Sequence, residues 1–371
     1  MPTYYKYTQL YNFARQVFKK IGCSDEHAEQ AADVLISADL RGIDSHGMAR
    51  LAGYVKQWEI KRLNPTPNIK VVHETPSTAV IDGDAGLGLV VAPTAMQIAI
   101  EKAQKVGTGW VAIKNSGHFG IAGYHAMMPL RYDMVGMTMT NASSLVTPTF
   151  SLDKLLGTNP IAVAVPTEKY PPFVADLATS AVAYGKMQIL QRQGKEAPLG
   201  LVQNEQGQPS HNPHEPKIGG ALLPLGSDRV HSSHKGYALG AIVDILSGVL
   251  PGANYGPWVP PFATAGNTSE RTPPVGEGTG HFVGAMRIDA FRPAQDFKQS
   301  MDHWISTFKE AKAVEGKEVL IPGEPERNAH IERLITGIPV LPAVVESLEK
   351  LAQQFDLEWL ENNKAQATSM Q

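Results

Sequence analysis

The sequence predicts an α/β protein in which a central sheet with flanking helices is accompanied by helices from both ends of the chain. Short β-branched runs alternate with helical runs from residue 77 to residue 140. Residues 7 to 63 and the region after residue 294 have helical patterns instead. With 371 residues the chain exceeds the usual size of one hydrophobic core. We therefore expect an N-terminal helical segment (1–75), an α/β domain (76–284), and a C-terminal strand and helices (285–371) that pack with the N-terminal segment.

The N-terminal region contains residues that are typical of the starts and ends of three helices. Thr8 could cap the first helix, and Ser24 could cap the second, because hydroxyls satisfy free amides at a helix start. Gly42 suits the end of the second helix. Asp44 or Ser45 would begin a third helix that runs to about residue 63, where "NPTPN" ends it.

The central region alternates strands and helices in the order "TAVIDG", "APTAMQIAIEKAQKV", "GWVAIK", "GIAGYHAMMPLRY" and "MVGMTMTNA". Further strands are expected at "IAVAVP", "PFVADL" and "HFVGAMRIDAF", and further helices at "SAVAYGKMQILQRQ" and "KGYALGAIVDILSG". Two loops, 203–220 and 251–280, are unusually long. Loops of this length act as lids, oligomer arms or mobile segments.

Composition excludes several classes of partner. The formal net charge is −3, and the basic residues are scattered, so there is no footprint for nucleic acid or anionic lipid. The single cysteine, Cys23, fits a reducing compartment. The longest apolar stretch contains Asp244 and is too short to span a bilayer, and the N-terminus does not read as a signal peptide. We expect a cytoplasmic protein that binds neither nucleic acid nor membrane.

His46, Arg50 and Tyr54 follow one another at steps of four, so a helix would present them on one face. Arginine can grip a carboxylate with two hydrogen bonds, and histidine can exchange a proton near neutral pH. The row could hold a small anionic substrate. A solvated polar face is the commoner meaning of such a row and stays open.

His118 lies in "SGHFG", at a junction between a predicted strand and a predicted helix. Ligands of α/β sheets bind beyond the carboxyl ends of strands, and small residues there let a ligand approach the backbone. The alternative is a loop histidine that makes a turn hydrogen bond. The small neighbours favour a ligand site.

The glycines at 83, 86 and 88 do not form a dinucleotide fingerprint. Their spacing is G-x-x-G-x-G, whereas the Rossmann pattern is G-x-G-x-x-G. Asp84 would face the phosphates, and the next strand ends in Lys114 and Asn115 instead of an acid for the ribose. We interpret the segment as a tight turn.

Two other predicted helix starts could bind phosphate or ribose. Asp176 ends a strand before Thr179 or Ser180, which could cap a helix, and His234 with Lys235 begins another helix. The histidine pairs at 211/214 and 231/234 lack the companions of a zinc site, and there is no G-x-S-x-G elbow. We expect no metal and no serine hydrolase.

Six motifs occur in the order "RGIDSHGMARLAGYV", "KNSGHFGIAGYHA", "LLGTNPIAVAVP", "VADLATSAVAYGK", "HKGYALGAIVDILSGVLPG" and "IPGEPE". With them the chain resembles the malate/L-lactate dehydrogenase family, which also contains sulfolactate and ureidoglycolate dehydrogenases. The resemblance covers roughly residues 5 to 340. It implies a mixed-sheet, non-Rossmann nicotinamide-binding domain and a homodimer with active sites near the subunit interface.

The resemblance also assigns site residues. The family's general acid/base falls on His118, and its substrate-side group falls on Ser45, His46 and Arg50. Cofactor-binding positions fall on Asn141, Ala142, Ser143, Asp176, Leu177, Ala178, His234 and Lys235. Some members carry an aspartate where this chain has Ser143, so an acidic role there is absent or moved.

The expected reaction is hydride exchange between NAD(P)H and a 2-oxo acid, with oxaloacetate and malate favoured as this small-molecule pair. NAD is the expected cofactor and NADP stays open. The alternatives are reduction of another 2-oxo acid or of a cyclic imino acid, and a catalytically silent ligand-binding protein on the same scaffold. His46 is the rival of His118 for the proton transfer.

Overall fold

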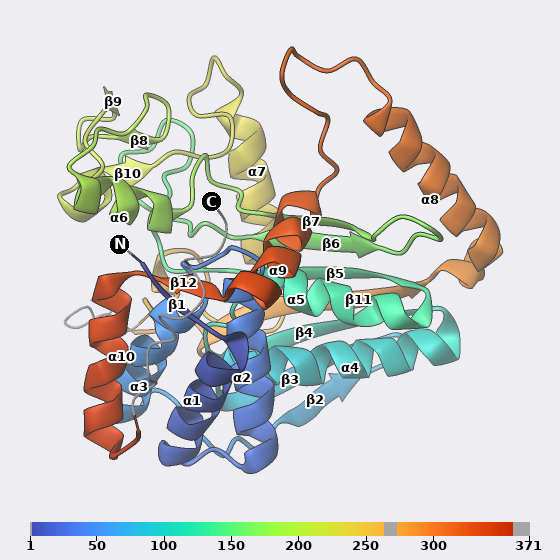
Figure 1. Ribbon diagram of the computed structural model, residues 1–371, viewed down its shortest axis with the longest axis horizontal. Coiled ribbons are helices and arrows are strands. Elements are labelled where there is room, and N and C mark those ends of the chain that lie inside the picture. Colours follow the sequence, from blue (N-terminus) through green and yellow to red (C-terminus); the bar gives the residue numbers. More distant parts are fainter. Residues whose placement is uncertain (1, 263–272, 359–371) are drawn as a thin grey trace.

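The computed structural model describes residues 2–262 and 273–358, and its centre is a mixed sheet with the strand order β2-β3-β4-β11-β5-β6-β7 (Figure 1). The strands are β2 (Lys70–Glu74), β3 (Thr78–Gly86), β4 (Thr108–Ser116), β5 (Met134–Thr140), β6 (Ile161–Val165), β7 (Phe173–Leu177) and β11 (Thr279–Arg287). β3 and β4 are parallel, and all other neighbours in this sheet are antiparallel. The predicted mixed α/β fold is confirmed.

Helices cover both faces of the sheet. α4 (Gly88–Val106) and α5 (Ala122–Met127) pack on one face, where Ile81, Val111 and Val283 contribute to a shared core. The end of α7 (Ser233–Asp244) and the π-helical turn Ile245–Val249 pack against the other face. Gly280 of β11 permits this contact, because a Cβ there would overlap the Ser247 carbonyl.

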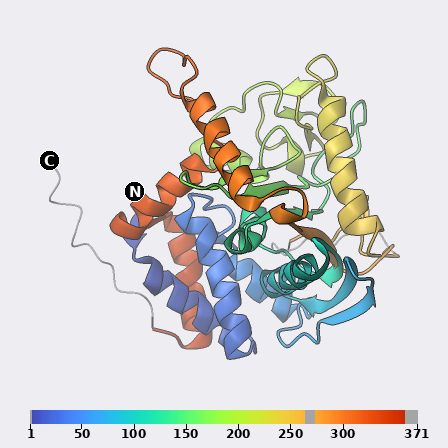
Figure 2. The same ribbon diagram turned by 90° about the vertical axis from the view of Figure 1, so that its right-hand side faces the viewer.

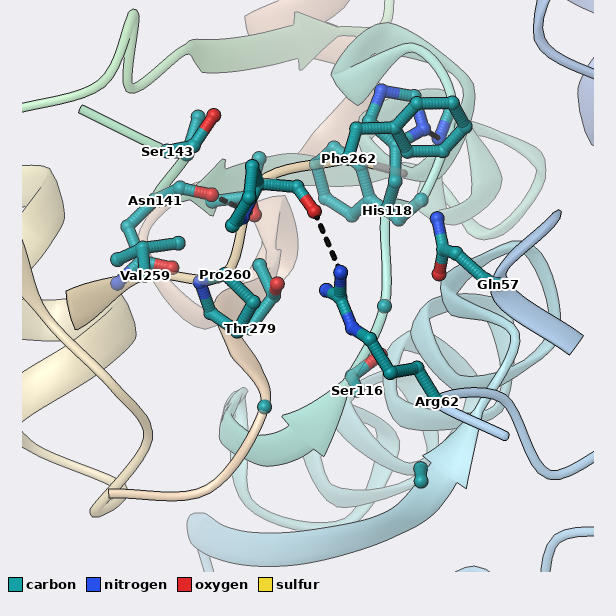
Figure 3. Close-up of a pocket in the computed structure, with 18 of the residues that line it drawn as sticks. Gln57, Arg62, Ser116, His118, Asn141, Ser143, Val259, Pro260, Phe262 and Thr279 are labelled. Carbon is teal, nitrogen blue, oxygen red and sulfur yellow. Dashed lines mark hydrogen bonds between the residues drawn. The ribbon is translucent and has the colours of Figure 1, made fainter. Parts of the chain in front are cut away.

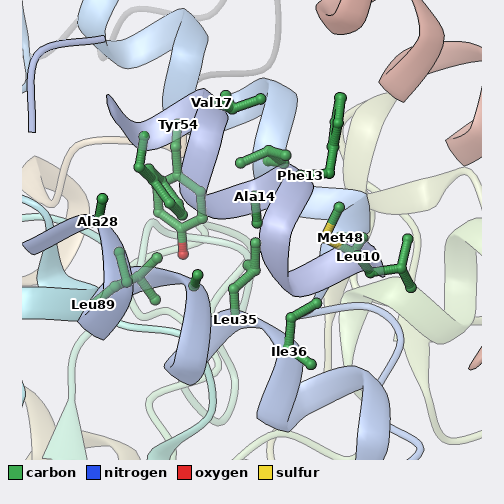
Figure 4. Close-up of a cluster of buried hydrophobic side chains, with 14 of the residues drawn as sticks. Leu10, Phe13, Ala14, Val17, Ala28, Leu35, Ile36, Met48, Tyr54 and Leu89 are labelled. Atoms are coloured by element: carbon green, nitrogen blue, oxygen red, sulfur yellow. The ribbon is translucent and has the colours of Figure 1, made fainter. Parts of the chain in front are cut away.

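The N-terminal helices share a core with the last helix. α1 (Tyr7–Lys20), α2 (Asp25–Leu40) and α3 (Leu51–Glu59) lie beside α10 (Pro342–Phe355), as the blue and red ribbons of Figure 2 show. β1 (Thr3–Tyr5) pairs antiparallel with β12 (Ile338–Val340). Figure 4 shows Tyr54 of α3 among the buried side chains of this cluster. The predicted domain boundaries stay a prediction.

The remaining elements lie around these two regions. They are α6 (Tyr184–Gln193), α8 (Ala294–Lys309), α9 (Glu324–Thr336), a small sheet of β8 (Val202–Gln203), β9 (Pro209–Ser210) and β10 (Ala221–Leu222), and short 3₁₀ turns at Met48–Arg50, Met128–Tyr132, Glu215–Lys217, Gly256–Trp258 and Ile288–Ala290. The long loop 203–220 thus contains part of the small sheet. None of the described helices combines the length and the apolar character that a bilayer crossing requires.

The predicted helix ends are partly confirmed. Ser24 caps α2 by accepting the His27 amide at 3.1 Å, and Gly42 follows α2 with a φ of +78°. The expected cap at Thr8 is wrong, because α1 already begins at Tyr7, and the Lys6 amide is satisfied by the Gln9 side chain. Strand β2 was not expected from the sequence. It is an exposed edge strand and lacks the alternation of a half-buried one.

Candidate active site

A cavity of about 420 Å³ lies at the edge of the sheet where β4 and β5 end and β11 begins. Ser116, Thr140 and Thr279 line it from these three strands, and Gln57 lines it from α3. Residues 259–262 of the second long loop line it from another side (Figure 3). Strand ends, a helix and a loop therefore converge on one space, which is typical of ligand sites in α/β proteins.

His118 lines this cavity from the loop that follows β4. The Gly120 amide donates to His118 Nδ1 at 3.3 Å, and the Tyr54 hydroxyl lies 2.7 Å from the same nitrogen. Because an amide can only donate, Nδ1 carries no proton in this arrangement and Tyr54 also donates to it. The proton of the neutral ring therefore sits on Nε2.

The glycine cluster before α4 makes room for the His118 loop. A Cβ on Gly88 would overlap the carbonyl of Gly117 and the backbone of His118. Asp84 and Ala85 turn the chain just before it with φ values of +52° and +54°. The predicted tight turn is therefore the irregular end of β3, followed directly by α4, and Gly88 lies against the His118 loop.

Burial keeps the histidines of the site neutral. The rings of His46 and His118 stack with centroids 5.5 Å apart. Burial lowers the pKa of His118 well below its usual value, and the neighbouring His46 and Arg50 lower it further. Burial likewise lowers the pKa of His46 to about 4, and the Ser45 hydroxyl lies 2.9 Å from its Nδ1.

The predicted third helix begins later than expected. α3 starts at Leu51 after a 3₁₀ turn, so His46 lies in a turn and not on the helix. The buried Asp39 carboxylate accepts the Met48 amide at 2.7 Å, and a Cβ on Gly47 would overlap that carboxylate. This side-chain hydrogen bond holds the segment in a turn and still directs His46 toward His118.

A distant residue fixes the same turn. Arg333 of α9 donates to the Asp39 carbonyl and forms an ion pair with Asp44. Burial raises the pKa of the Asp39 carboxyl to about 8, with Asp44 adding to the rise. The turn that carries Ser45 and His46 is thereby held from both sides.

Arg50 lies beside the histidines with most of its donors unused. Its Nε donates to the Ser45 carbonyl at 2.7 Å, and its Cζ lies 5.3 Å from the centre of the Phe262 ring. Within residues 2–262 and 273–358, no carboxylate forms an ion pair with it. Its outer nitrogens are available for an acid group.

A buried histidine supports the strand ends below the cavity. His281 of β11 lies 2.7 Å from the Thr140 hydroxyl and 2.9 Å from the Ser116 hydroxyl, and its ring stacks on Phe119. Both hydroxyl residues line the cavity. His281 therefore joins three neighbouring strands directly beneath the His118 loop.

The predicted cofactor residues Asn141, Ala142 and Ser143 line the cavity after β5. The Asn141 amide is fully used, because it donates to the Asn254 carbonyl at 2.8 Å and accepts the Gly280 amide at 3.1 Å. Ser143 is partly exposed, and its hydroxyl has no partner among the described residues. Only Ser143 of these three presents a free polar side chain.

The other predicted cofactor residues lie outside the cavity lining. Asp176, Leu177 and Ala178 end β7 and enter the next loop, and the Asp176 carboxylate accepts the Gly123 amide of α5 at 2.7 Å. Crowding by protein raises the pKa of Asp176 to about 6, although its side chain remains open to solvent on one side. Leu177 is 43% exposed, so this strand end offers an apolar platform beside a carboxyl.

Two further predictions concern helix starts. Thr179 and Ser180 do not cap a helix, because α6 begins at Tyr184 and the Thr179 hydroxyl donates to the Asn159 carbonyl at 3.0 Å. His234 and Lys235 do lie in the first turn of α7, as predicted, and no residue lining the cavity contacts them through a side-chain bond within the described ranges.

Among the cavity residues that the sequence did not indicate are Gln57, Lys61, Arg62 and Phe262. Gln57 and Lys61 continue the helical spacing of Arg50 and Tyr54, so extending that row could have identified them. Phe262 carries no local signal, because it comes from a long loop. In the described part of the chain, no group of three or more histidine, cysteine or acidic side chains could hold a metal ion.

Comparison with known proteins gives one consistent result. Residues 5–349 match the family model described as malate/L-lactate dehydrogenase. The chain is 42% identical to a malate dehydrogenase of Pyrococcus abyssi, with 95% of each chain covered, and 39% identical to an L-sulfolactate dehydrogenase of Methanocaldococcus jannaschii, with 85% of this chain and 87% of that one covered. The solved malate dehydrogenase of Pyrococcus horikoshii OT3 superposes with a TM-score of 0.86 at 38% identity, with 97% of each chain covered.

Proposed function

The chain belongs to the malate/L-lactate dehydrogenase family of hydroxy acid dehydrogenases, and we propose that it interconverts oxaloacetate and malate with NADH or NADPH. One observation carries the proposal. A neutral His118, held at Nδ1 by Tyr54 and stacked on His46, lines a cavity beside Arg50, which has no carboxylate partner in the described part of the chain. A proton donor and a cation that can bind a carboxylate are the groups needed to reduce the carbonyl of an anionic acid.

Arg50 holds the carboxylate next to the carbonyl. Its guanidinium can form two parallel hydrogen bonds with a carboxylate, and such a pair fixes the orientation of the reacting carbonyl. The bond from Nε to the Ser45 carbonyl and the contact with Phe262 restrict the side chain before substrate arrives. Binding then needs little further ordering.

His118 exchanges the proton with the substrate oxygen. In reduction, the protonated ring donates from Nε2 to the developing alkoxide, and in oxidation the same nitrogen accepts the proton. The Tyr54 hydroxyl can either donate to Nδ1 or accept from it, so it holds the ring in both protonation states. The low pKa of His118 favours release of its proton.

The cavity fits the reactive end of a nicotinamide cofactor. Gly117 lines the cavity without a side chain, so a flat ring can approach the backbone there. A Cβ at this position would already be in ordinary contact with the Gly86 carbonyl at 3.5 Å and with Gln57 Oε1 at 3.6 Å. The volume suits a nicotinamide and a small acid, and Leu177 with Asp176 would receive the rest of the dinucleotide outside the cavity. When bound, the reduced nicotinamide supplies the hydride. Ser143, Ala178 and Lys235 are the further residues that we propose for its binding.

The proposed preference for malate follows from the similar proteins. They are named for malate and sulfolactate, two hydroxy acids that each carry a second acid group. NAD is the favoured cofactor, and NADP is the alternative.

We propose a homodimer that forms through α7. Tyr237, Ile242, Ile245, Val249 and Leu250 are exposed large apolar side chains on α7 and the turn after it. An apolar surface of this kind is typical of a subunit interface. Light scattering of the purified chain tests this, and a monomer that persists at high concentration contradicts it.

The function is tested by following the loss of reduced-nicotinamide absorbance. NADH and NADPH are used separately with oxaloacetate, pyruvate, 2-oxoglutarate, sulfopyruvate and a cyclic imino acid. A clear preference for oxaloacetate supports the proposal, and a preference for another acid changes the substrate. Folded protein that is silent with all of them, and that binds neither cofactor in calorimetry, overturns it.

A further inference from the structure

α3 and the segment that follows it contribute unused polar groups to the cavity lining. Gln57 is only 5% exposed and lines the cavity, yet its amide has no hydrogen-bond partner among the described residues. Gln57 is not among the residues with fully buried, unpartnered side-chain atoms, so its amide is accessible in the cavity, where a ligand can provide the missing partner. Gln57 lies one turn after Tyr54 on α3.

Two cationic side chains line the cavity near Gln57. Lys61 and Arg62 line the cavity, and neither forms an ion pair with a described carboxylate. Arg62 uses one nitrogen to donate to the Pro261 carbonyl at 3.0 Å, and Figure 3 shows its guanidinium directed into the cavity, on the same side as Gln57. Burial lowers the pKa of Arg62, which reflects the cost of a partly buried cation that lacks a counter-ion.

The cavity as a whole is positive. No aspartate or glutamate is among the described residues that line it, whereas Lys61 and Arg62 are. Lys61, Ala85 and Asn115 also have left-handed backbone conformations, with φ of +58°, +54° and +55°, and all three line the same cavity. Strained backbone of this kind is concentrated at ligand sites.

Resting on the proposed function, we propose that Gln57, Lys61 and Arg62 form the anchor for the second acid group of a dianionic 2-oxo acid. The order of groups along α3 and the turn before it matches such a molecule. Arg50 lies just before α3 and four residues before Tyr54, and Gln57 follows Tyr54 by three residues, or about 4.5 Å along the helix axis. A carboxylate at Arg50 and a carbonyl at His118, which Tyr54 contacts, leave a second carboxylate or sulfonate pointing toward Gln57 and Arg62.

A cofactor phosphate is the other anion that could use these cations. The substrate is favoured because Gln57 is one turn from the residue that holds His118. Of the proposed cofactor residues, Ser143 lines the cavity, whereas Asp176 and Lys235 lie outside its lining. If the cations bind the substrate, removing them should raise the KM of the substrate; if they bind a cofactor phosphate, it should raise the KM of the cofactor. A kinetic test therefore separates them.

The test compares oxaloacetate with 2-oxobutyrate, which has the same chain length and a methyl group in place of the second carboxylate. The full-length Arg62→Gln protein is expected to lose about 10- to 100-fold in kcat/KM for oxaloacetate, as hydrogen bonds to charged groups contribute, and to keep its value for 2-oxobutyrate. Arg62→Lys is expected to restore part of the loss, because it restores the charge. Arg292→Gln removes an exposed arginine outside the cavity and serves as the matched control.

Lys61→Gln and Gln57→Leu repeat the comparison at the other two positions. Lys61 is exposed, so this variant keeps the fold even if Arg62→Gln does not. Equal losses for both acids in these variants overturn the proposal, and so does a rise confined to the KM of NADH or NADPH. A wild-type chain that reduces neither acid contradicts the proposed function itself. A wild-type chain that prefers oxaloacetate, with variants that keep the same preference, contradicts only the proposed anchor.

Discussion

Two groups of residues at the cavity differ in how their polar side chains are satisfied. Around His118, Tyr54 and Gly120 occupy Nδ1, Ser45 contacts His46, and the Phe262 ring packs beside the imidazole. In the second group, Gln57 has no side-chain partner among the described residues and Arg62 has only a backbone carbonyl.

The difference separates the reaction from the choice of substrate. The proton transfer that we propose for His118 needs a ring whose position is fixed before substrate binds, and the contacts with Tyr54 and Gly120 provide this. Recognition needs groups that gain their partner from the ligand, so that an acid without the second charged group leaves them unsatisfied. Substitutions in the two groups should therefore have different kinetic signatures.

The largest effect is expected at His118. His118→Asn removes the proton donor and should lower kcat by about two to four orders of magnitude for every accepted acid. His46→Asn should cost much less, because we propose that His46 only packs beside the reacting ring. Steady-state kinetics measure both, and calorimetry checks that cofactor binding survives. Full turnover by His118→Asn would remove the assignment and move it to His46.

The neutral histidines also predict a dependence of stability on pH. Burial lowers the pKa of His125 to about 4 and that of His281 to about 3, and both side chains are fully buried. The unfolded chain binds these protons near pH 6.5, so stability is present above that pH and is lost as the pH falls toward the folded-state values. From pH 7 to pH 5 the free energy of unfolding should fall by about 2 kcal/mol for each ring.

Urea unfolding at the two pH values measures this loss. A His125→Gln variant lacks one titrating ring, and its loss should be smaller than that of the wild type by about 2 kcal/mol. Equal losses in both proteins would show that His125 takes up its proton in the folded state.

A substitution of Arg50 should differ from one of Arg62 in which substrates it affects. Arg50→Gln should lower kcat/KM about 10- to 100-fold for oxaloacetate and 2-oxobutyrate alike, because both acids carry the first carboxylate. The Arg292→Gln control should leave both values unchanged. A loss confined to oxaloacetate would place the second acid group at Arg50 and reverse the roles of the two arginines.

The smallest effect is expected at Tyr54. Tyr54→Phe keeps the buried ring but removes the hydroxyl that lies 2.7 Å from His118 Nδ1. One hydrogen bond of this kind corresponds to about a two- to tenfold decrease, which should appear in kcat with KM little changed. A shift in the pH profile of kcat should accompany it, because the hydroxyl holds the ring in both protonation states. An unchanged profile would assign Tyr54 to packing alone.

The sequence was sufficient for the parts of the site that lie on local patterns. The spacing of Arg50 and Tyr54 and the small residues around His118 are visible in single segments. The Tyr54 hydroxyl does lie 2.7 Å from His118 Nδ1, but only the residues around His118 line the cavity. The order of strands and helices likewise predicted a sheet covered by helices, apart from the exposed edge strand β2, and the family resemblance implied that the sheet is mixed.

Long-range contacts account for what the sequence did not indicate. The start of α3 was misplaced because the Asp39 carboxylate, nine residues away, takes the Met48 amide. Phe262 enters from a loop with no periodicity, and His281 from a strand whose alternation says nothing about Ser116. Such contacts depend on which segments meet in space, and no local pattern records that.

The ion pair between Arg333 and Asp44 has a consequence for how the enzyme becomes active. These residues are 289 positions apart, so the turn with Ser45 and His46 gains this support only when nearly all of the chain has been synthesised. Contacts between such distant segments form slowly, because the entropy cost of closing a long loop comes before the stabilisation that the contact provides. A nascent chain can therefore build much of its sheet while the turn with Ser45 and His46 is held only by the local Asp39–Met48 bond, and full catalytic competence should arrive as one of the last events of folding.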